Sequence, residues 1–504
     1  MTRDYRAGRF FSSRYRIFFT ILVLLLLVSC VPRPAAGPGA PARPEAGAEA
    51  DQAAASQSQH ILLIQSLPGA IIQESGPYQD ADVYQIEVID LRSGEPVEAI
   101  APVEVGVEMN YAFSPDHTRL AVTSKFAGCS GLCLRVYELS NLRQTAKVEL
   151  PETEGGQGYA SQIVFDRQGK RIAVTYIADG KGHLALVDLP SSGAPVVEEI
   201  NFSYSPNQMS FSGDGTRLMI VAHRLPEDIP SGPEVSPQLV ALLWDAQTLQ
   251  TIWEQELTEV KDGFYGSQDH SKPEENTYYQ AGIAVDADRQ KIYLAHADAD
   301  QLTTVDFLEQ RVETVAIREK RAWYEDLIEA VLSMGVRRVQ AKAANSYHRQ
   351  ALLSADGGIL YVVGIRYNLV KQDNGNYERV HTPYGLAGWE LESARRLFQV
   401  ETDASELRRG LGETLILNGY DQNSREYRPF TEVFELSSGQ KIAHFQRVYA
   451  YPTLRTDGSP ALVSVYTSDR GRTFLSVLKE DFQKSGLLWE KTLTQGYAFW
   501  PELR

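Results

Sequence analysis

The sequence predicts an all-β fold built from repeated four-stranded units, and three observations lead to this expectation. One short phrase recurs along the chain: an apolar residue, a tight turn centred on Asp or Gly, and then an alternating β run. Two further strand-like runs follow each copy of the phrase. The composition, with 43% hydrophobic and 23% charged residues among 504, is that of a globular chain.

The recurring phrase is clearest in the first half of the chain. The segment FSPD at 113–116 leads into the β run LAV at 120–122, and FSGDG at 211–215 leads into LMI at 218–220. Copies begin near positions 113, 165, 211, 285, 353 and 454. The interval between the copies at 353 and 454 is roughly double the usual step, so we expect a degraded copy between them. Leu407, followed by the run LIL at 415–417, matches this expected copy.

The two ends of the chain predict how the units are arranged. Four antiparallel strands in about 50 residues make one blade of a β-propeller. The N-terminal part supplies only three of four strands, at 61–65, 83–91 and 97–100, while YAFWP at 497–501 nearly repeats YAFSP at 111–115. We therefore expect a single closed β-propeller whose N- and C-terminal strands share one blade, because an open array would expose strand edges. It should have eight blades, or seven if the weak unit near Leu407 merges with a neighbour.

The recurring phrase resembles the WD40-like and YVTN-type propeller repeats of bacterial secreted proteins, over nearly all of residues 61–504. The chain lacks the Gly-His and Trp-Asp signatures of true WD40 repeats except at Trp244-Asp245. The runs TIWE at 251–254 and LWEK at 488–491 look instead like the outer strand of quinoprotein-type blades. This resemblance implies the fold and leaves the activity open.

The N-terminus has the layout of an export signal, with five arginines ahead of the apolar run at 17–28. That run is too short to span a bilayer, which needs about 20 helical residues. It ends in Leu27-Val28-Ser29-Cys30, which resembles the lipobox of bacterial lipoproteins, so Cys30 is the expected lipidation site. The alternatives are an uncleaved anchor or an ordinary secretory signal with a chance cysteine.

These signals divide the chain into three parts. Residues 1–29 are the expected signal peptide, and 30–59 are the lipidated cysteine and a Pro, Ala and Gly-rich tether, which has too little apolar surface to fold. Residues 60–504 form the propeller. The net charge of −16 argues against nucleic-acid binding. We expect an exported monomer held by its lipid at the cell surface or in the periplasm.

Two further cysteines, Cys129 and Cys133, flank a three-residue loop. An exported chain meets conditions in which disulfides persist, so a bridge between them is the preferred interpretation. Free thiols and half of a metal site are the alternatives, and no nearby histidine completes a zinc site.

Loop lengths predict which face of the ring carries the function. The first and third turns of each blade are short, and the long insertions all belong to the opposite face. We call this the long-loop face, because binding residues concentrate on long loops held by a rigid scaffold. The expected insertions are 66–82, 150–160, 224–238, 259–280, 318–348, 366–383 and 419–430.

The insertion at about 318–348 is expected to contain a helix with an apolar stripe and an excess of basic residues. This helix would either dock an acidic ligand or simply pack its stripe on neighbouring blades. Aromatic residues and arginines supply most binding energy at interfaces. The predicted ligand-binding residues on this face are Tyr265, His270, Trp323, Arg337, Arg338, Tyr367 and His381.

Catalytic signatures are thin. The sequence has no Gly-x-Ser-x-Gly, no His-Glu-x-x-His, no phosphate loop and no Cys-x-x-Cys. Five histidines lie near strand ends on the long-loop face, and the acidic pairs 286/288 and 298/300 alternate as calcium ligands can, but we assign no catalytic group, metal or cofactor. We expect a non-catalytic protein that binds a protein, peptide or glycan partner. The alternative is a propeller enzyme of lyase, lactonase or glycosidase type, with quinone-dependent oxidation as a third and weaker hypothesis.

Overall fold

Every residue that the computed structural model describes belongs to one compact unit, Gln57–Arg504. The structure describes residues 60–67, 83–90, 97, 99–100, 102–105, 109–126, 128–129, 131–150, 159–178, 181–190, 193–224, 234–235, 238–267, 277–318, 345–371, 377–410, 412–421, 428–454, 460–467, 473–478, 487–493 and 498–499. These residues form strands and turns without any helix. Within this part of the chain, no helix has the length and apolarity needed to cross a membrane.

The described strands pair into eight sheets, and each contributes one blade. Blade 1 contains β35 (Ala498–Phe499), β1 (His60–Leu67), β2 (Val83–Asp90) and β3 (Val103–Val105). Blade 2 contains β4 (Asn110–Phe113), β5 (Arg119–Ser124), β6 (Cys133–Glu138) and β7 (Gln144–Glu149). Blade 3 contains β8 (Tyr159–Phe165), β9 (Arg171–Ala178), β10 (Lys181–Asp188) and β11 (Val196–Asn201). Blade 4 contains β12 (Tyr204–Phe211), β13 (Arg217–Arg224), β15 (Leu239–Asp245) and β16 (Thr251–Glu256).

The second half of the ring repeats this order. Blade 5 contains β19 (Gly282–Asp286), β20 (Lys291–Ala295), β21 (Gln301–Asp306) and β22 (Arg311–Ala316). Blade 6 contains β23 (Asn345–Leu353), β24 (Ile359–Lys371), β25 (Tyr377–Glu390) and β26 (Arg395–Val400), extended by β18 (Thr277–Gln280), β17 (Gly263–Ser267) and β14 (Glu234–Val235). Blade 7 contains β27 (Ala404–Arg409), β28 (Thr414–Asp421), β29 (Arg428–Glu435) and β30 (Lys441–Gln446). Blade 8 contains β31 (Tyr449–Leu454), β32 (Pro460–Thr467), β33 (Thr473–Leu478) and β34 (Leu487–Leu493).

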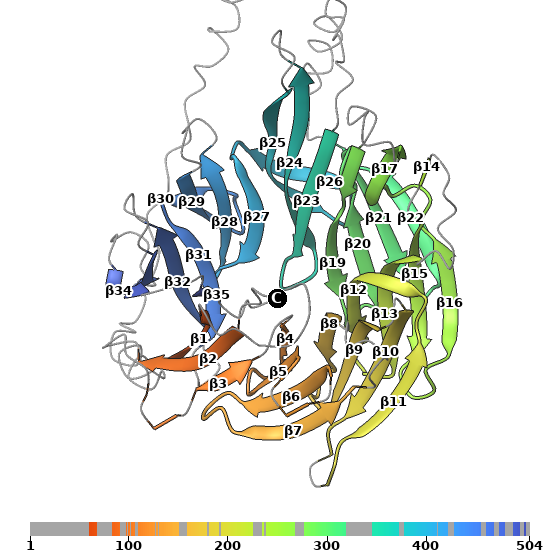
Figure 1. Cartoon of the computed structure of the whole chain (residues 1–504). Helices are drawn as coiled ribbons and strands as arrows, with labels where there is room; N and C mark the ends of the chain where they lie inside the picture. The colour runs from red at the N-terminus through yellow and green to blue at the C-terminus, as the bar shows by residue number, and fades with distance from the viewer. Residues whose placement is uncertain are drawn as a thin grey trace, which may run out of the picture. The chain divides into compact units, whose positions relative to one another are not determined.

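The ring is closed by strands from both ends of the folded unit (Figure 1). The C-terminal strand β35 pairs antiparallel with β1, joining Ile64 to Phe499 and Gln65 to Ala498. This pairing confirms that the two ends share blade 1. The weak unit near Leu407 is a complete four-stranded blade, so eight blades are present and not seven. The expected strand at 97–100 is wrong: these residues make a turn, and β3 follows it.

The recurring phrase folds into one turn because a serine and an aspartate close it. In blade 2 the Ser114 hydroxyl donates to Asp116 (2.6 Å) and accepts from the main-chain N–H of Arg119 (2.9 Å). Ser212 and Asp214 repeat this bond in blade 4 (2.6 Å). Ser354 and Asp356 repeat it in blade 6 (2.6 Å). Local hydrogen bonding of this kind fixes a turn independently of the rest of the fold.

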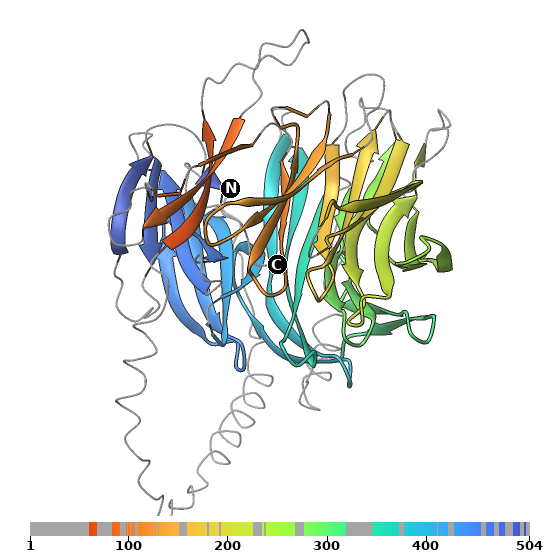
Figure 2. The same ribbon diagram turned by 90° about the horizontal axis from the view of Figure 1, so that it is seen from below.

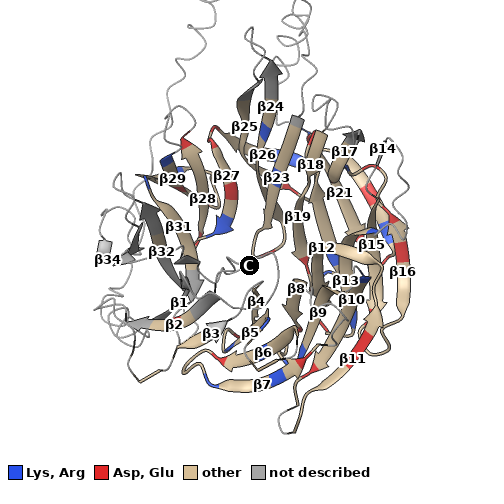
Figure 3. Ribbon diagram, in the orientation of Figure 1, with Lys and Arg blue, Asp and Glu red and all other residues tan. Residues whose placement is uncertain are grey.

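The core lies between blades and not within them. In blades 2 to 7 the second and third strands are largely buried on both faces, as in β5 and β9, and their side chains pack against a neighbouring blade. One cluster, for example, joins Val136 of blade 2 to Ile172 and Val174 of blade 3. The outer strands β7, β11, β16 and β30 are largely exposed, and acidic residues are prominent on β11 and β16 (Figure 3). Burial on both sides of each sheet therefore holds the ring together.

Amide side chains that are partly or fully buried add directional links between blades. Asn110 Nδ2 donates to the carbonyl of Ser161 (2.8 Å), and Gln162 Nε2 donates to that of Asn207 (2.6 Å). Asn418, which is fully buried, donates to the carbonyl of Ala450 in blade 8 (2.8 Å). Because each bond crosses from one blade to the next, it fixes the spacing of the innermost strands.

Candidate functional site

The central strands of blade 6 extend beyond those of the other blades (Figure 1), and Figure 2 shows the same ring of blades from the side. Its two central strands run for 13 and 14 residues, and their outer halves pair from Ile365 to Lys371, with Tyr367 opposite His381. The prediction of a loop at 366–383 is therefore wrong over most of its length. The polar residues there resemble a loop in sequence, but they alternate across a two-stranded ribbon whose pairing satisfies the backbone.

The insertion at 259–280 also forms strands where a loop was expected. Its strand β18 runs parallel to β23, with Thr277 opposite Asn345 and Gln280 opposite His348. Strand β17 pairs with β18, and β14, from the insertion at 224–238, pairs with β17. The link between blades 4 and 5 thus adds β17 and β18 to blade 6, and the connection between β13 and β15 of blade 4 adds β14, which gives a seven-stranded sheet.

Four rings from four neighbouring strands form a continuous row on one face of this sheet, which we call the aromatic–histidine row. The ring centroids of Tyr278 and His348 are 5.3 Å apart, those of His348 and Tyr367 5.8 Å, and those of Tyr367 and His381 5.2 Å. Such cross-strand pairs stabilise a sheet. Tyr278, at one end of the row, is 41% exposed, and Phe264 beside it is 42% exposed. This end of the row therefore offers apolar surface to a partner.

His348 is held in one orientation at the centre of the row. Its Nδ1 lies 2.9 Å from Oε1 of Gln280, and the hydroxyl of Ser346 bonds to its Nε2. Because a carbonyl oxygen only accepts, Nδ1 donates to Gln280 and Nε2 accepts from Ser346. These bonds fit the neutral imidazole, and they fix the plane of the ring.

The opposite face of the same sheet carries a second aromatic set. Tyr279 lies between Tyr265 (5.3 Å) and Tyr347 (5.1 Å, stacked), and Arg366 lies over the ring of Tyr347 (5.1 Å). Lys261 reaches over the ring of Tyr279 (5.2 Å). Desolvation raises the pKa of Tyr279 above its usual value, although the charge of Lys261 opposes this effect.

An ion cluster fixes the base of this second face against blade 5. Asp300 binds Nη2 of Arg349 (2.8 Å) and also binds Arg396. Arg349 is only 5% exposed, and its guanidinium lies 4.7 Å from the ring centre of Tyr384. Burial alone would raise the pKa of Asp300, but the two arginines outweigh it and leave the pKa below its usual value.

A partly exposed histidine and a buried carboxylate lie beyond the other end of the row, near Tyr278. Asp262 is 4% exposed and accepts from the N–H of Ala281 (2.7 Å), and its other oxygen lies 2.8 Å from Nε2 of His223. Asn207, from the innermost strand of blade 4, donates to the same oxygen (2.5 Å). Desolvation, and then the negative charge of Asp262, raise the pKa of Tyr278. The carboxylate of Asp262 thus fixes the imidazole ring of His223, as a carboxylate does for a histidine that acts as a general base.

The structure brings some of the predicted binding residues together and separates others. Tyr367 and His381 are neighbours in the aromatic–histidine row, whereas Tyr265 lies on the opposite face of the same sheet. His270, Trp323, Arg337 and Arg338 lie outside the described residues, as do Cys30 and the tether. Most of the expected helical insertion lies outside them too, and its expected end is wrong, because residues 345–348 belong to β23.

The other candidate ligands have partners within the protein. His296 is 1% exposed and bonds to the hydroxyl of Thr303 (2.8 Å), and burial lowers its pKa. Each aspartate of the two alternating pairs faces a cation: Asp286 binds Arg289, Asp288 binds Arg167, Asp298 binds Lys261, and Asp300 binds Arg349. These carboxylates form ion pairs in the structure, so nothing in their geometry singles them out as ligands for a metal.

Cys129 and Cys133 form a disulfide, with their Cα atoms 6.4 Å apart. The bridge lies in the connection between β5 and β6, which belongs to the long-loop face. Glu149 lies close to both sulfurs, but the sulfurs are bonded to each other. The site is therefore a crosslink that shortens this loop.

No protein-family model matches the chain, and neither does any curated protein sequence. Similar solved structures include dihydro-heme d1 dehydrogenase NirN, with a TM-score of 0.47 and 10% identity over 87% of this chain and 74% of that one. An oligogalacturonate lyase in complex with manganese gives 0.41 and 13% over 85% and 100%. Sqt1 of Saccharomyces cerevisiae gives 0.43 and 10% over 78% and 92%. Since these TM-scores are below 0.5, we base no argument on them.

Proposed function

We propose that this β-propeller binds a protein, peptide or glycan partner at the extended sheet of blade 6. The aromatic–histidine row carries the proposal, because it places four rings side by side at an edge that extends beyond the ring of blades. Aromatic side chains offer a large contact area at a low entropic cost, which is why they dominate binding surfaces. The exposed Phe264 and Tyr278 would make first contact.

The cellular setting is part of the same proposal. The basic residues, the apolar run and Cys30 support export and lipid anchoring. The disulfide supports an oxidising compartment, in which such bonds persist. A partner in the cell envelope or outside the cell would then meet the extended sheet.

Capture of the partner tests the proposal. Full-length protein is immobilised and used to recover binding material from cell-envelope extracts. The double variant Tyr278→Ala, Tyr367→Ala should lose most of the captured material at unchanged folding, whereas Asp116→Ala, in a tight turn away from the long-loop face, should keep it. Capture that is equal for wild type and double variant would exclude the row as the binding surface.

The second candidate function is catalysis by an enzyme of lyase, lactonase or glycosidase type, favoured by the His223–Asp262 pair. We place it second because Nδ1 of His223 is shielded from solvent and has no hydrogen-bond partner among the described residues. His223→Gln should abolish turnover of a panel of lactones and polysaccharides if this pair is catalytic. It should leave partner capture intact if the first proposal holds.

A further inference from the structure

A cleft of about 670 Å³ separates blades 5 and 6, away from the aromatic–histidine row. One wall is the face of β20, β21 and β22, and the other is formed by two turns of blade 6 and the start of β26. Its apolar lining residues are Leu302, Val315, Ile359, Leu391 and Leu397. Charged side chains surround them, so the cleft has an apolar floor and a polar rim, as protein interfaces do.

The cleft lies where blade 5 departs from a pattern shared by blades 2, 3 and 4. The second strand of blades 2, 3 and 4 begins with an arginine that reaches the following blade. Arg171 Nη1 donates to the carbonyl of Ala246 (3.0 Å), and Arg217 Nη1 donates to Oε1 of Gln290 (3.4 Å). Arg119 packs so closely on Gly169 of the next blade that a Cβ there would lie 2.8 Å from its Nη2.

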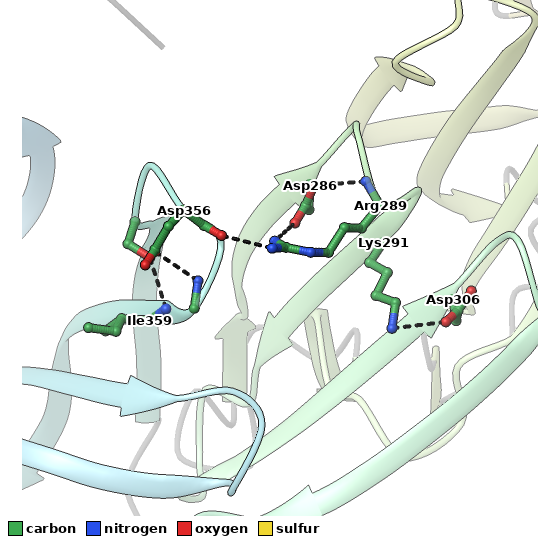
Figure 4. A network of polar contacts seen from close by, with 8 residues as sticks. Asp286, Arg289, Lys291, Asp306, Asp356 and Ile359 are labelled. Carbon is green, nitrogen blue, oxygen red and sulfur yellow. Dashed lines mark hydrogen bonds and ion pairs between the residues drawn. The ribbon is translucent and has the colours of Figure 1, made fainter.

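Blade 5 has Lys291 at this position, and Lys291 does not bridge to blade 6. Its Nζ binds Asp306 of its own blade (3.0 Å), as Figure 4 shows. A lysine ends in a compact ammonium group, whereas the longer guanidinium of arginine can serve two partners at once. Lys291 lines the cleft, and its side chain does not cross it to blade 6.

Contacts on two sides keep the cleft from collapsing. Arg289 binds Asp286 (2.7 Å) and donates to the carbonyl of Asp356 in blade 6 (2.9 Å), so it links the turns of the two blades (Figure 4). Gly357 permits this approach, because a Cβ there would lie 1.9 Å from Arg289 Nη1. On another side the backbone of Arg318 bonds to Ala394 and Arg396 at the start of β26 (2.9 Å each).

The charges of the lining indicate which partner fits. Five acidic residues face three basic ones: Asp306, Glu313, Asp356, Glu390 and Glu392 against Arg289, Lys291 and Arg311. The three basic residues are already engaged by acceptors of the protein itself. Glu392 is exposed and has no ion-pair partner among the described residues. The cleft therefore keeps unneutralised negative charge beside apolar surface.

We propose that the interblade cleft is a second binding site, which accepts a short segment of a partner protein carrying an apolar anchor next to a lysine or arginine. The apolar side chain would occupy the floor formed by Val315, Ile359 and Leu397. The basic side chain would pair with Glu392 at the rim. This site is independent of the long-loop face and would allow the ring to hold two partners at once.

Selection from a phage-displayed library of random 12-residue peptides tests the proposal, with purified full-length protein as the target. Enriched peptides should combine an apolar and a basic residue. Lys291→Arg should place a guanidinium across the cleft, as the arginines of blades 3 and 4 do, and weaken the affinity of a selected peptide at least tenfold, measured by fluorescence anisotropy. Glu392→Lys, on the exposed rim, should weaken it several-fold without affecting folding.

Matched variants keep the result interpretable. Arg217→Lys replaces the equivalent arginine between blades 4 and 5 by lysine and should leave the affinity for the selected peptide unchanged. Tyr278→Ala, in the aromatic–histidine row, should also leave this affinity unchanged. Enrichment of acidic peptides, no enrichment above an empty surface, or equal affinity for wild type and Lys291→Arg would each overturn the proposal. Loss of binding in Tyr278→Ala alone would assign the peptide to the long-loop face instead.

Discussion

Asn418 should be among the most sensitive single positions for stability, because its amide joins blades 7 and 8 in a fully buried place. It donates to the carbonyl of Ala450 (2.8 Å) and accepts from the hydroxyl of Thr431 (2.7 Å) and the N–H of Ala450 (3.2 Å). All three residues are 0% exposed. Replacement by alanine removes these bonds where water cannot take their place.

The cost can be worked out bond by bond. After Asn418→Ala, the N–H of Ala450 still bonds to Thr431 (2.9 Å), and Thr431 can still donate to the carbonyl of Val448 (2.9 Å). The carbonyl of Ala450 loses its amide donor, and an unsatisfied buried group costs about 1–3 kcal/mol. Adding about 1 kcal/mol for the weakened bonds gives roughly 2–4 kcal/mol, a large share of a typical total of about 5–15 kcal/mol.

Equilibrium unfolding in urea measures this difference. The midpoint should fall while the slope stays unchanged, since the native surface is the same. Asn201→Ala is the control: Asn201 is exposed at the end of an outer strand, so its replacement should cost less than about 0.5 kcal/mol. A loss of less than about 1 kcal/mol for Asn418→Ala would refute the idea that buried amides fix the blade spacing.

The remaining predictions concern anchoring, closure and pH. Cys30→Ser should release the protein from membranes, as fractionation would show, and a variant that stays lipidated would contradict the lipobox. Removing residues 496–504 should lower the melting temperature markedly, because it deletes the strand that pairs with β1; an unchanged Tm would argue against closure through β35. Burial lowers the pKa of His296, and the unfolded chain keeps a value of about 6.5. Stability should therefore fall as the pH drops below about 6.5, because the unfolded state binds the proton more readily, and His296→Gln should remove this part of the pH dependence.

Local chemistry explains why the blades could be predicted from the sequence. The turn built by Ser114 and Asp116 is closed by side chains that are two residues apart in the sequence. Because this contact is local, the sequence alone predicts the turn. Closure could also be predicted, because the segment before Phe499 copies the one before Phe113.

The extended sheet could not be predicted, because its pairing is long-range. Tyr278 and His348 are brought together only when β18 lies beside β23, and no local pattern marks that contact. Asp262 looks like an ordinary loop acid in the sequence, and its importance comes from burial beside His223 and Asn207. The sequence does carry two signals, the neighbouring tyrosines at 278–279 and the histidine at 348, but no local pattern connects them.

The parallel pairing of β18 with β23 has a consequence for the order in which the chain can fold. Strands β17 and β18 precede all of blade 5 in sequence, yet their partner β23 follows it. During synthesis from the N-terminus, this hairpin must wait unpaired until about residue 350 has left the ribosome. The strands of blade 5 lie between β18 and β23 in the sequence, so blade 5 must form before these two strands have paired. Pairing of strands that are far apart in the sequence is slow. Blades 4 to 6 should consequently acquire protection from hydrogen exchange together, and later than blades 2 and 3.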